Sequence, residues 1–352
     1  MAAITLDQVS FNYPGTTEPV LKNLCLHIED GTTHALLGAS GAGKTTLLNM
    51  LSGLLSPSSG ALRFGDKNVS TIGARERNVA LVFQFPVLYE TKSVLDNLMF
   101  PLLNRGWVMK EARGRAIEVA EELELADVLH LRPAGLSLYQ KQLAAIAKSL
   151  VRTDVDLVLL DEPLTAVEPA MKWRLRQRLA SFQVEHGLTM IYVTHDQTEA
   201  LTFASQVSLL SEGRILQTGT PEDIYNHPID RFVGDFIGSP GMRFIPSARL
   251  HSDQPPLGLL FAEPPERDAG TLMGIRAEWL TPQRSADGIW ELVSKRLVGT
   301  DGGQEKSLLG FRNGDFELLA EGLGNWCKGD RANLRVQRYA LLPAEPQTAI
   351  TS

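Results

Sequence analysis

Short apolar runs alternate with longer mixed stretches through the first two thirds of the chain. Residues 79–83, 157–160 and 190–193 are apolar throughout, which is typical of strands buried on both faces of a sheet. The mixed stretches between them have the length and spacing of helices. This alternation predicts an α/β domain, which we assign to residues 1–236.

Two of the mixed stretches predict particular helices. Between residues 110 and 129, apolar residues recur every three or four positions, with charged residues on the opposite face. We expect this amphipathic helix to belong to a helical subdomain. Residues 140–151 predict another helix, and Ser137 stands near its start as a candidate N-cap.

After residue 236 the pattern changes, because prolines and glycines punctuate the chain and the helical spacing is lost. Short β-like runs bounded by turns follow, at residues 272–276, 290–297, 307–311, 316–319 and 332–341. They predict a small barrel or sandwich over residues 237–345. We expect the last residues, 346–352, to form a loose tail.

Composition limits the kind of protein this can be. A chain of 352 residues can bury two separate cores, and its net charge of −7 argues against nucleic-acid binding, which needs a basic face. Cys25 and Cys327 show no metal-ligand spacing, so we expect them to fill space in a protein of a reducing compartment. The sequence shows no secretion signal and no apolar run as long as a membrane span, so we expect membrane association only through a partner.

A glycine-rich loop, GASGAGKTT at residues 38–46, lies between a short apolar run and an apolar helix-like run. Its glycines let backbone N–H groups curl around phosphates without Cβ clashes, and a helix N-terminus favours anions. We expect Lys44 to reach the β- and γ-phosphates and the hydroxyl of Thr45 to bind Mg²⁺. The loop therefore predicts nucleotide binding, by Gly38, Ser40, Gly41, Gly43, Lys44, Thr45 and Thr46.

Polar residues follow three of the predicted strands. Asp161 and Glu162 are adjacent carboxylates that repel each other, so a nearby cation explains them better than a solvated strand end does. We expect Asp161 to hold Mg²⁺ and Glu162 to polarise the attacking water as general base. His195 is expected to contact the γ-phosphate and position this water, and Gln84 to reach both Mg²⁺ and the water.

Two aromatic residues near the N-terminus are candidates for stacking on the base of the nucleotide. Tyr13 is our preferred candidate, because an aromatic face accepts any base plane. Phe11 is the competing choice, and either residue could belong to the core instead.

Taken in order, these motifs resemble those of the ATP-binding-cassette (ABC) ATPases. The set comprises the loop at 38–46, Gln84, Leu136-Ser137, Leu159-Leu160-Asp161-Glu162-Pro163 and Thr194-His195-Asp196. In addition, residues 236–240 followed by 274–280 resemble the junction and accessory barrel of the carbohydrate and glycerol-type importer ATPases. The resemblance covers nearly the whole chain.

The resemblance implies a P-loop nucleotide-binding domain with a helical subdomain, followed by a small all-β, oligonucleotide-binding-like (OB-like) transport-associated domain. It implies that ATP and Mg²⁺ are bound and that ATP hydrolysis drives solute import. It also implies a peripheral location at the cytoplasmic face of the bacterial inner membrane, on transmembrane permease subunits that residues 85–89 would touch. A periplasmic or extracellular binding protein would capture the solute.

The chain departs from the family at one motif. The family's signature is Leu-Ser-Gly-Gly-Gln, whereas residues 136–140 read Leu-Ser-Leu-Tyr-Gln. In the family, the signature of one subunit covers the ATP held by the other, so Ser137 and Gln140 are expected to act in trans. Leu138 and Tyr139 add side chains where close approach is needed, which should weaken that half-site.

Two smaller departures agree with this, since Leu143 replaces an arginine of the family and Glu168 replaces an aspartate. Two explanations remain open. Either the chain pairs with a non-identical ATPase subunit that carries an intact signature, or a homodimer tolerates the altered one. We favour the heterodimer, because Glu162 and His195 would be idle in a homodimer with two poor sites.

Other function classes fit less well. ABC ATPases that act on DNA or ribosomes usually carry a long coiled coil or two cassettes, and this chain has a short gap between Gln84 and Leu136. A scaffold with an inactive cassette would not need Glu162 and His195. The solute stays open among sugars, polyols, glycerol and glycerol phosphate, with an inclination to a two-ATPase polyol or glycerol system.

Overall fold

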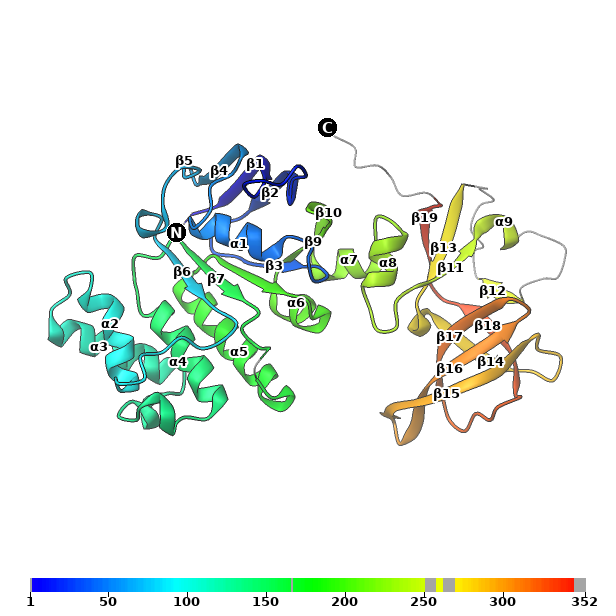
Figure 1. Cartoon of the computed structure of the whole chain (residues 1–352). Helices are drawn as coiled ribbons and strands as arrows, with labels where there is room; N and C mark the ends of the chain where they lie inside the picture. The colour runs from blue at the N-terminus through cyan, green and yellow to red at the C-terminus, as the bar shows by residue number, and fades with distance from the viewer. Residues whose placement is uncertain (1, 166, 251–257, 262–269, 345–352) are drawn as a thin grey trace. The chain divides into compact units, whose positions relative to one another are not determined.

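The computed structural model describes residues 2–165, 167–250, 258–261 and 270–344 (Figure 1). The chain forms two compact units, Met1–Pro221 and Glu222–Ser352. The tail expected at residues 346–352 lies outside the described residues.

A mixed six-stranded sheet forms the centre of the first unit, in the order β10-β9-β3-β8-β7-β6. Its strands are β3 (Thr33–Leu37), β6 (Val79–Val82), β7 (Leu157–Asp161), β8 (Met190–Thr194), β9 (Gln206–Ser211) and β10 (Arg214–Gly219). All neighbours are parallel except β10, which pairs with β9 in the antiparallel sense. The apolar runs of the sequence therefore do lie in buried parallel strands.

A smaller antiparallel sheet lies in the same unit, in the order β2-β1-β4-β5. Its strands are β1 (Ile4–Phe11), β2 (Leu21–Ile28), β4 (Ser59–Phe64) and β5 (Lys67–Asn68). Helix α1 (Lys44–Ser52) lies between the two sheets (Figure 1), and its Leu47 and Met50 share one buried cluster with residues of both. Apolar burial on both sides fixes the direction of the helix that follows the glycine-rich loop.

The first unit contains further helices, and some of them form a helical subdomain. The further helices are α2 (Val94–Leu103), α3 (Met109–Glu122), α4 (Leu138–Leu150), α5 (Pro169–His186) and α6 (Gln197–Phe203). Helix α3 is shorter than the predicted 110–129, because Glu124 adopts a left-handed conformation (φ +55°) that an α-helix cannot continue through. The expected N-cap of α4 is confirmed, since Ser137 Oγ accepts a hydrogen bond from the backbone N–H of Gln140.

The second unit is rich in β-structure, which confirms the predicted fold class of an α/β part followed by a β-rich part. Its strands form one sheet in the order β11-β13-β19 and another in the order β12-β18-β15-β16-β17, with β14 paired to β18. The strands are β11 (Arg243–Pro246), β12 (Leu259–Phe261), β13 (Thr271–Ile275), β14 (Leu280–Arg284), β15 (Trp290–Asp301), β16 (Gln304–Asn313), β17 (Phe316–Leu323), β18 (Arg331–Val336) and β19 (Ala340–Pro343).

One of the predicted runs, 332–341, is wrong as a single strand. It divides into β18 and β19, which belong to different sheets. The break follows Val336, where the backbone N–H of Gln337 bonds to the carbonyl of Trp279 instead of continuing the ladder. The polar Gln337 and Arg338 follow Val336, but polar residues also alternate with apolar ones inside β18, so they do not mark the break in the sequence.

Three short helices, α7 (Pro221–Asn226), α8 (Arg231–Phe236) and α9 (Ser247–Leu250), accompany these sheets. The fully buried Arg276 donates hydrogen bonds to the carbonyl of Tyr225 through Nε (3.0 Å) and Nη2 (2.7 Å), and another to Ile237. Residues 222–236 therefore pack with the β-rich unit. The assignment of 1–236 to the ATPase domain and 237–345 to the β domain stays a prediction.

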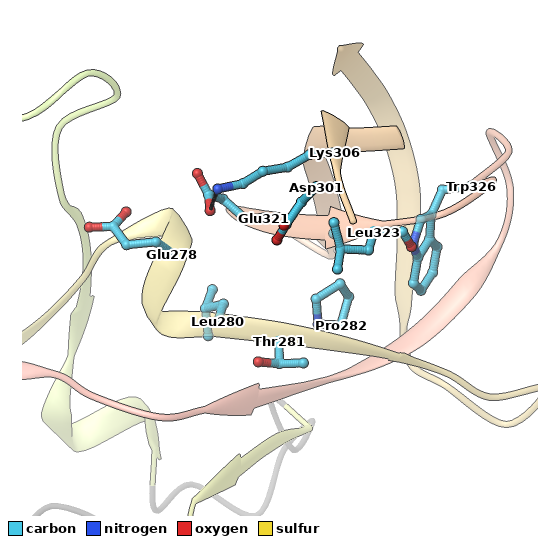
Figure 2. Close-up of a pocket in the computed structure, with 10 residues that line it drawn as sticks. Glu278, Leu280, Thr281, Pro282, Asp301, Lys306, Glu321, Leu323 and Trp326 are labelled. Carbon is cyan, nitrogen blue, oxygen red and sulfur yellow. Dashed lines mark hydrogen bonds and ion pairs between the residues drawn. The ribbon is translucent and has the colours of Figure 1, made fainter. Parts of the chain in front are cut away.

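A cavity of about 390 Å³ lies within the second unit (Figure 2). Charged side chains surround one side of it, Glu278, Asp301, Lys306 and Glu321, and Lys306 Nζ lies 2.7 Å from Glu321 Oε2. Leu280 and Pro282 form part of its apolar lining. No residue of the predicted ATP site lines this cavity.

Cys25 and Cys327 are both exposed free thiols, so the expectation that they fill space is wrong. Of the helices in the described ranges, none has the length and apolarity needed to cross a membrane.

We expect His34 to make the first unit sensitive to acid. It is buried in β3 with Nε2 2.8 Å from Ser208 Oγ, and burial lowers its pKa to about 4. Unfolded His34 takes up a proton below pH 6.5 while folded His34 stays neutral, so the free energy of unfolding falls as the pH drops from 6.5 to 4, by about 3 kcal/mol in total. Urea unfolding at pH 7 and pH 4.5 measures this loss, and it should be smaller in His34→Gln. An equal loss in both proteins would exclude His34 as its cause.

Candidate nucleotide-binding and hydrolysis site

The glycine-rich loop connects β3 to α1, and two of its glycines stand where a side chain would not be accommodated. A Cβ on Gly38 would lie 2.2 Å from the backbone oxygen of Leu210, and Gly43 adopts φ +104° as the N-cap of α1. Both positions exclude a side chain for different reasons, contact in the first case and backbone conformation in the second. The loop can therefore present its N–H groups at the start of a helix.

Lys44 is buried against this loop. Its Nζ donates hydrogen bonds to the carbonyl oxygens of Gly38 (2.7 Å) and Ala39 (2.9 Å). Burial lowers the pKa of Lys44, and the nearby Glu162 and Asp161 act in the opposite direction. The ammonium group thus lies against the glycine-rich loop and near the two carboxylates at the end of β7.

The next two residues of α1 face different surroundings. Thr45 is exposed, whereas Thr46 is buried and its Oγ1 lies 3.2 Å from the hydroxyl of Tyr13. Tyr13 is 40% exposed and packs edge-on against the buried Phe11, with ring centroids 4.9 Å apart. The structure therefore places Phe11 in the core and leaves Tyr13 at the surface beside the loop.

Glu162 is the centre of a hydrogen-bonded group. His195 Nδ1 lies 3.0 Å from Glu162 Oε1, and both Gln84 Nε2 (3.4 Å) and Thr165 Oγ1 (3.2 Å) donate to Oε2. Glu162 also has a left-handed backbone (φ +44°), an uncommon conformation for a glutamate, while its N–H bonds to the carbonyl of Val193. Strain at one residue that is held by its neighbours is frequent at functional sites.

Asp161 is the last residue of β7 and is half-buried. Burial raises its pKa, the charge of Glu162 raises it further, and Lys44 lowers it. A further cation near Asp161, in addition to Lys44, would stabilise its ionised form.

The register of the sheet explains why these residues meet. In the parallel pairs, Asp161 of β7 is opposite Val193 of β8, and Thr194 of β8 is opposite Leu37 of β3. The three strands therefore end at one edge, and the residues that follow them come together there. The structure brings Lys44, Glu162, His195 and Gln84 together at this edge. Thr165 also bonds to Glu162, and its only sequence signal is its place one turn after that residue.

The signature residues form a separate group at the start of α4. Ser137 and Gln140 cap the helix reciprocally, since the N–H of Ser137 also donates to Gln140 Oε1 at 2.9 Å. Leu138 projects to the surface and is 50% exposed. Tyr139 has its hydroxyl buried with no hydrogen-bond partner in the described part of the chain, and burial raises its pKa. The two substitutions thus differ, and Leu138 is the one that occupies the outer surface.

Comparison with known proteins shows the family. Residues 21–165 match the ABC transporter family. The sn-glycerol-3-phosphate import ATP-binding protein UgpC of Yersinia pestis is 36% identical over 86% of this chain and 86% of its own length. The chain belongs to the ABC transporter ATPases. The maltose/maltodextrin import ATP-binding protein MalK of Escherichia coli K12 is 37% identical to this ABC ATPase over 83% of the chain and 81% of MalK.

Further similarities cover a smaller share of this ABC ATPase. The diacetylchitobiose uptake system ATP-binding protein MsiK of Streptomyces coelicolor is 39% identical over 70% of the chain, and the match spans 65% of MsiK. Among solved structures, cbiO1 of Clostridium perfringens covers 63% of the chain and 90% of its own, with a TM-score of 0.60 and 28% identity. A dimer of the cassette MJ0796 with bound ADP and phosphate gives a TM-score of 0.56 at 28% identity, covering 62% of this chain and 98% of that one. The chain is an ABC transporter ATPase of the importing type, similar to MalK and UgpC.

Proposed function

We propose that this ABC ATPase hydrolyses ATP to power uptake of a polar small solute, namely a sugar, a polyol, glycerol or glycerol phosphate. The extent of the similarity to UgpC and MalK supports this, because it covers more of the chain than the first unit alone can account for. In this proposal the chain is peripheral at the cytoplasmic face of the bacterial inner membrane, bound to permease subunits, with a solute-binding protein outside. The exposed Phe85 and Val87, close in sequence to Gln84, are the proposed contact with the permease.

ATP binds to the loop at 38–46 in this proposal. Backbone N–H groups and Lys44 bind the phosphates, Ser40, Gly41 and Thr46 contribute within the loop, and Tyr13 stacks on adenine. The exposure of Tyr13 and its bond to Thr46 support this assignment, because the ring is accessible and tethered to the first turn of α1.

The donor set of the site fits Mg²⁺. Thr45, Asp161 and Gln84 offer a hydroxyl, a carboxylate and an amide oxygen, and oxygen ligands suit this ion. Gln84 uses its amide nitrogen to bond Glu162, which leaves its carbonyl oxygen for a metal. Bound Mg²⁺ would neutralise charge on the β- and γ-phosphates.

Glu162 acts as the general base and His195 holds it in place. A carboxylate can accept the proton of an attacking water, and bonds from His195 and Gln84 restrict its orientation. Because Gln84 contacts Glu162 directly, movement of the loop that carries Gln84 would change the orientation of the Glu162 carboxylate. His195 also contacts the γ-phosphate in this proposal.

We further propose that the second ATPase subunit is a different chain. The observation that carries this is Leu138, which stands exposed where a glycine of the family allows close approach to the partner's ATP. Ser137 keeps a hydroxyl at the surface, and both it and Gln140 act in trans. This chain's own ATP is hydrolysed under the intact signature of the partner, and the partner's ATP is hydrolysed slowly.

Co-purification tests the pairing. The tagged chain, expressed from its native genes with its permease, should recover a second ATPase subunit of different mass, identified by mass spectrometry. The complex should hydrolyse ATP in a solute-dependent manner, while the chain and permease alone should not. A fully coupled rate from the chain and permease alone would show a homodimer. Hydrolysis that needs no permease would instead support an ABC ATPase that does not act in transport.

A further inference from the structure

A fully buried carboxylate lies beneath the hydrolysis site. Glu199 of α6 is 3% exposed and accepts three hydrogen bonds. The donors are Lys172 Nζ at 2.8 Å, the Tyr192 hydroxyl at 3.0 Å and Thr194 Oγ1 at 3.0 Å. Buried charges persist when they are paired and hydrogen-bonded, as this one is. None of these four residues belongs to the proposed ATP-binding and hydrolysis set.

The hydroxyl of Thr194 links Glu199 to Asp196, the residue that follows His195. Thr194 donates to Glu199, so the oxygen of the same hydroxyl is free to accept from the backbone N–H of Asp196, at 2.9 Å. Asp196 in turn caps α6 by accepting from the N–H groups of Thr198 and Glu199. The backbone is therefore held on both sides of His195.

His195 itself has little other support. Its side chain is 58% exposed, and among the residues that the structure describes its ring bonds to Glu162 through Nδ1. Packing cannot fix an imidazole that is mostly in solvent, so the backbone that carries it must do so. That backbone is the segment fixed by Thr194 and Asp196.

The opposite side of Glu199 is tied to α5. Lys172 lies in the first turn of that helix, whose N-cap is Glu168, and its ammonium is paired with Glu199. Burial and Glu199 together raise the pKa of Tyr192 well above its usual value, which keeps its hydroxyl a donor. The carboxylate thus joins the end of β8 to the start of α5.

We propose that Glu199 is a positioning residue that holds His195 against Glu162 through the hydroxyl of Thr194. Lys172 pairs with the Glu199 carboxylate and orients it. The inference rests on the proposed hydrolytic role of His195 and adds to it the element that sets the position of the imidazole.

Three substitutions in the complete transporter test this chain of contacts. Glu199→Gln and Thr194→Val keep the size of the side chains and should lower kcat for ATP about ten- to hundredfold, the cost of a displaced catalytic group, with little change in KM. Thr194→Ser retains the hydroxyl and should restore kcat. Tyr192→Phe is the matched control, because it removes a different donor to Glu199 and leaves the Thr194 contact intact. Thermal unfolding of each variant shows whether it folds.

Combination with His195→Ala separates positioning from a general structural effect. If Glu199 acts through His195, Glu199→Gln should cause no further loss in that background. Single-turnover hydrolysis of radiolabelled ATP over hours measures the low residual rates. The proposal fails if Thr194→Val keeps the wild-type kcat, or if the losses of Glu199→Gln and His195→Ala multiply. Failure of the proposed function gives a different result. The wild-type complex would then show no ATP hydrolysis that is lost when Glu162 is replaced.

Discussion

Replacement of Glu162 by glutamine will reduce ATP hydrolysis by the transporter about 10²–10⁴-fold. Glutamine has nearly the same shape and can still bond to His195 and Gln84, but its amide cannot accept the proton of the attacking water. ATP binding should persist, because the loop at 38–46 and Tyr13 are unchanged. Phosphate release and equilibrium binding of labelled ATP, measured on the same preparation, give the two results.

Glu185→Gln supplies the matched control for this experiment. Glu185 is an exposed glutamate on α5, outside the group around Glu162, and its substitution should leave the rate unchanged. Solute uptake that is unaffected by Glu162→Gln would contradict a catalytic role and would favour a scaffold with an inactive cassette.

Restoration of glycine at positions 138 and 139 should raise the ATPase activity of the purified chain alone about 10²-fold. With Leu138→Gly and Tyr139→Gly, two copies of the chain could each cover the other's ATP with backbone N–H groups. One hydrogen-bond donor directed at the charge that develops in the transition state typically changes kcat by a factor of this size. The initial rate of phosphate release, at chain concentrations that allow pairing, is the measurement.

The alanine pair Leu138→Ala and Tyr139→Ala separates close approach from simple removal of bulk, since a Cβ remains at both positions. It should give much less activity than the glycine pair. Glycine also costs up to about 1 kcal/mol per position in a helix, so thermal unfolding must accompany the assay. An unchanged rate in a folded glycine pair would contradict the view that the altered signature limits the homodimer.

Much of the first unit could be predicted because β6, β7 and β8 are almost entirely apolar and the sequence of the glycine-rich loop is distinctive. The second unit was harder. The run 332–341 contains polar residues throughout, so Gln337 and Arg338 do not mark the end of β18, and Leu280–Arg284 contains a proline that obscures β14. Pairing partners in other strands decide both, and a local pattern does not contain them.

That Lys44, Glu162 and His195 lie close together could be expected from the sequence, because each stands just after a predicted strand or within the glycine-rich loop. The support beneath them could not be expected in this way. Glu199 stands among polar residues in the sequence, and only the fold shows that its carboxylate is buried. Similarly, the sequence treats Leu138 and Tyr139 alike, whereas the structure exposes the first and buries the hydroxyl of the second.

The pairing of β6 with β7 has a wider consequence. The chain leaves the sheet after Val82 and re-enters it at Leu157, yet Val79 and Leu157 are direct neighbours in register. The whole excursion between them, which contains Gln84 and the signature, is therefore an insertion between adjacent strands. The exposed start of α4, where the signature lies, can therefore change while the strand pairing of β6 with β7 is kept. In the proposed pairing with a different subunit, a change there weakens the cover of the partner's ATP and leaves the group around Glu162 in place.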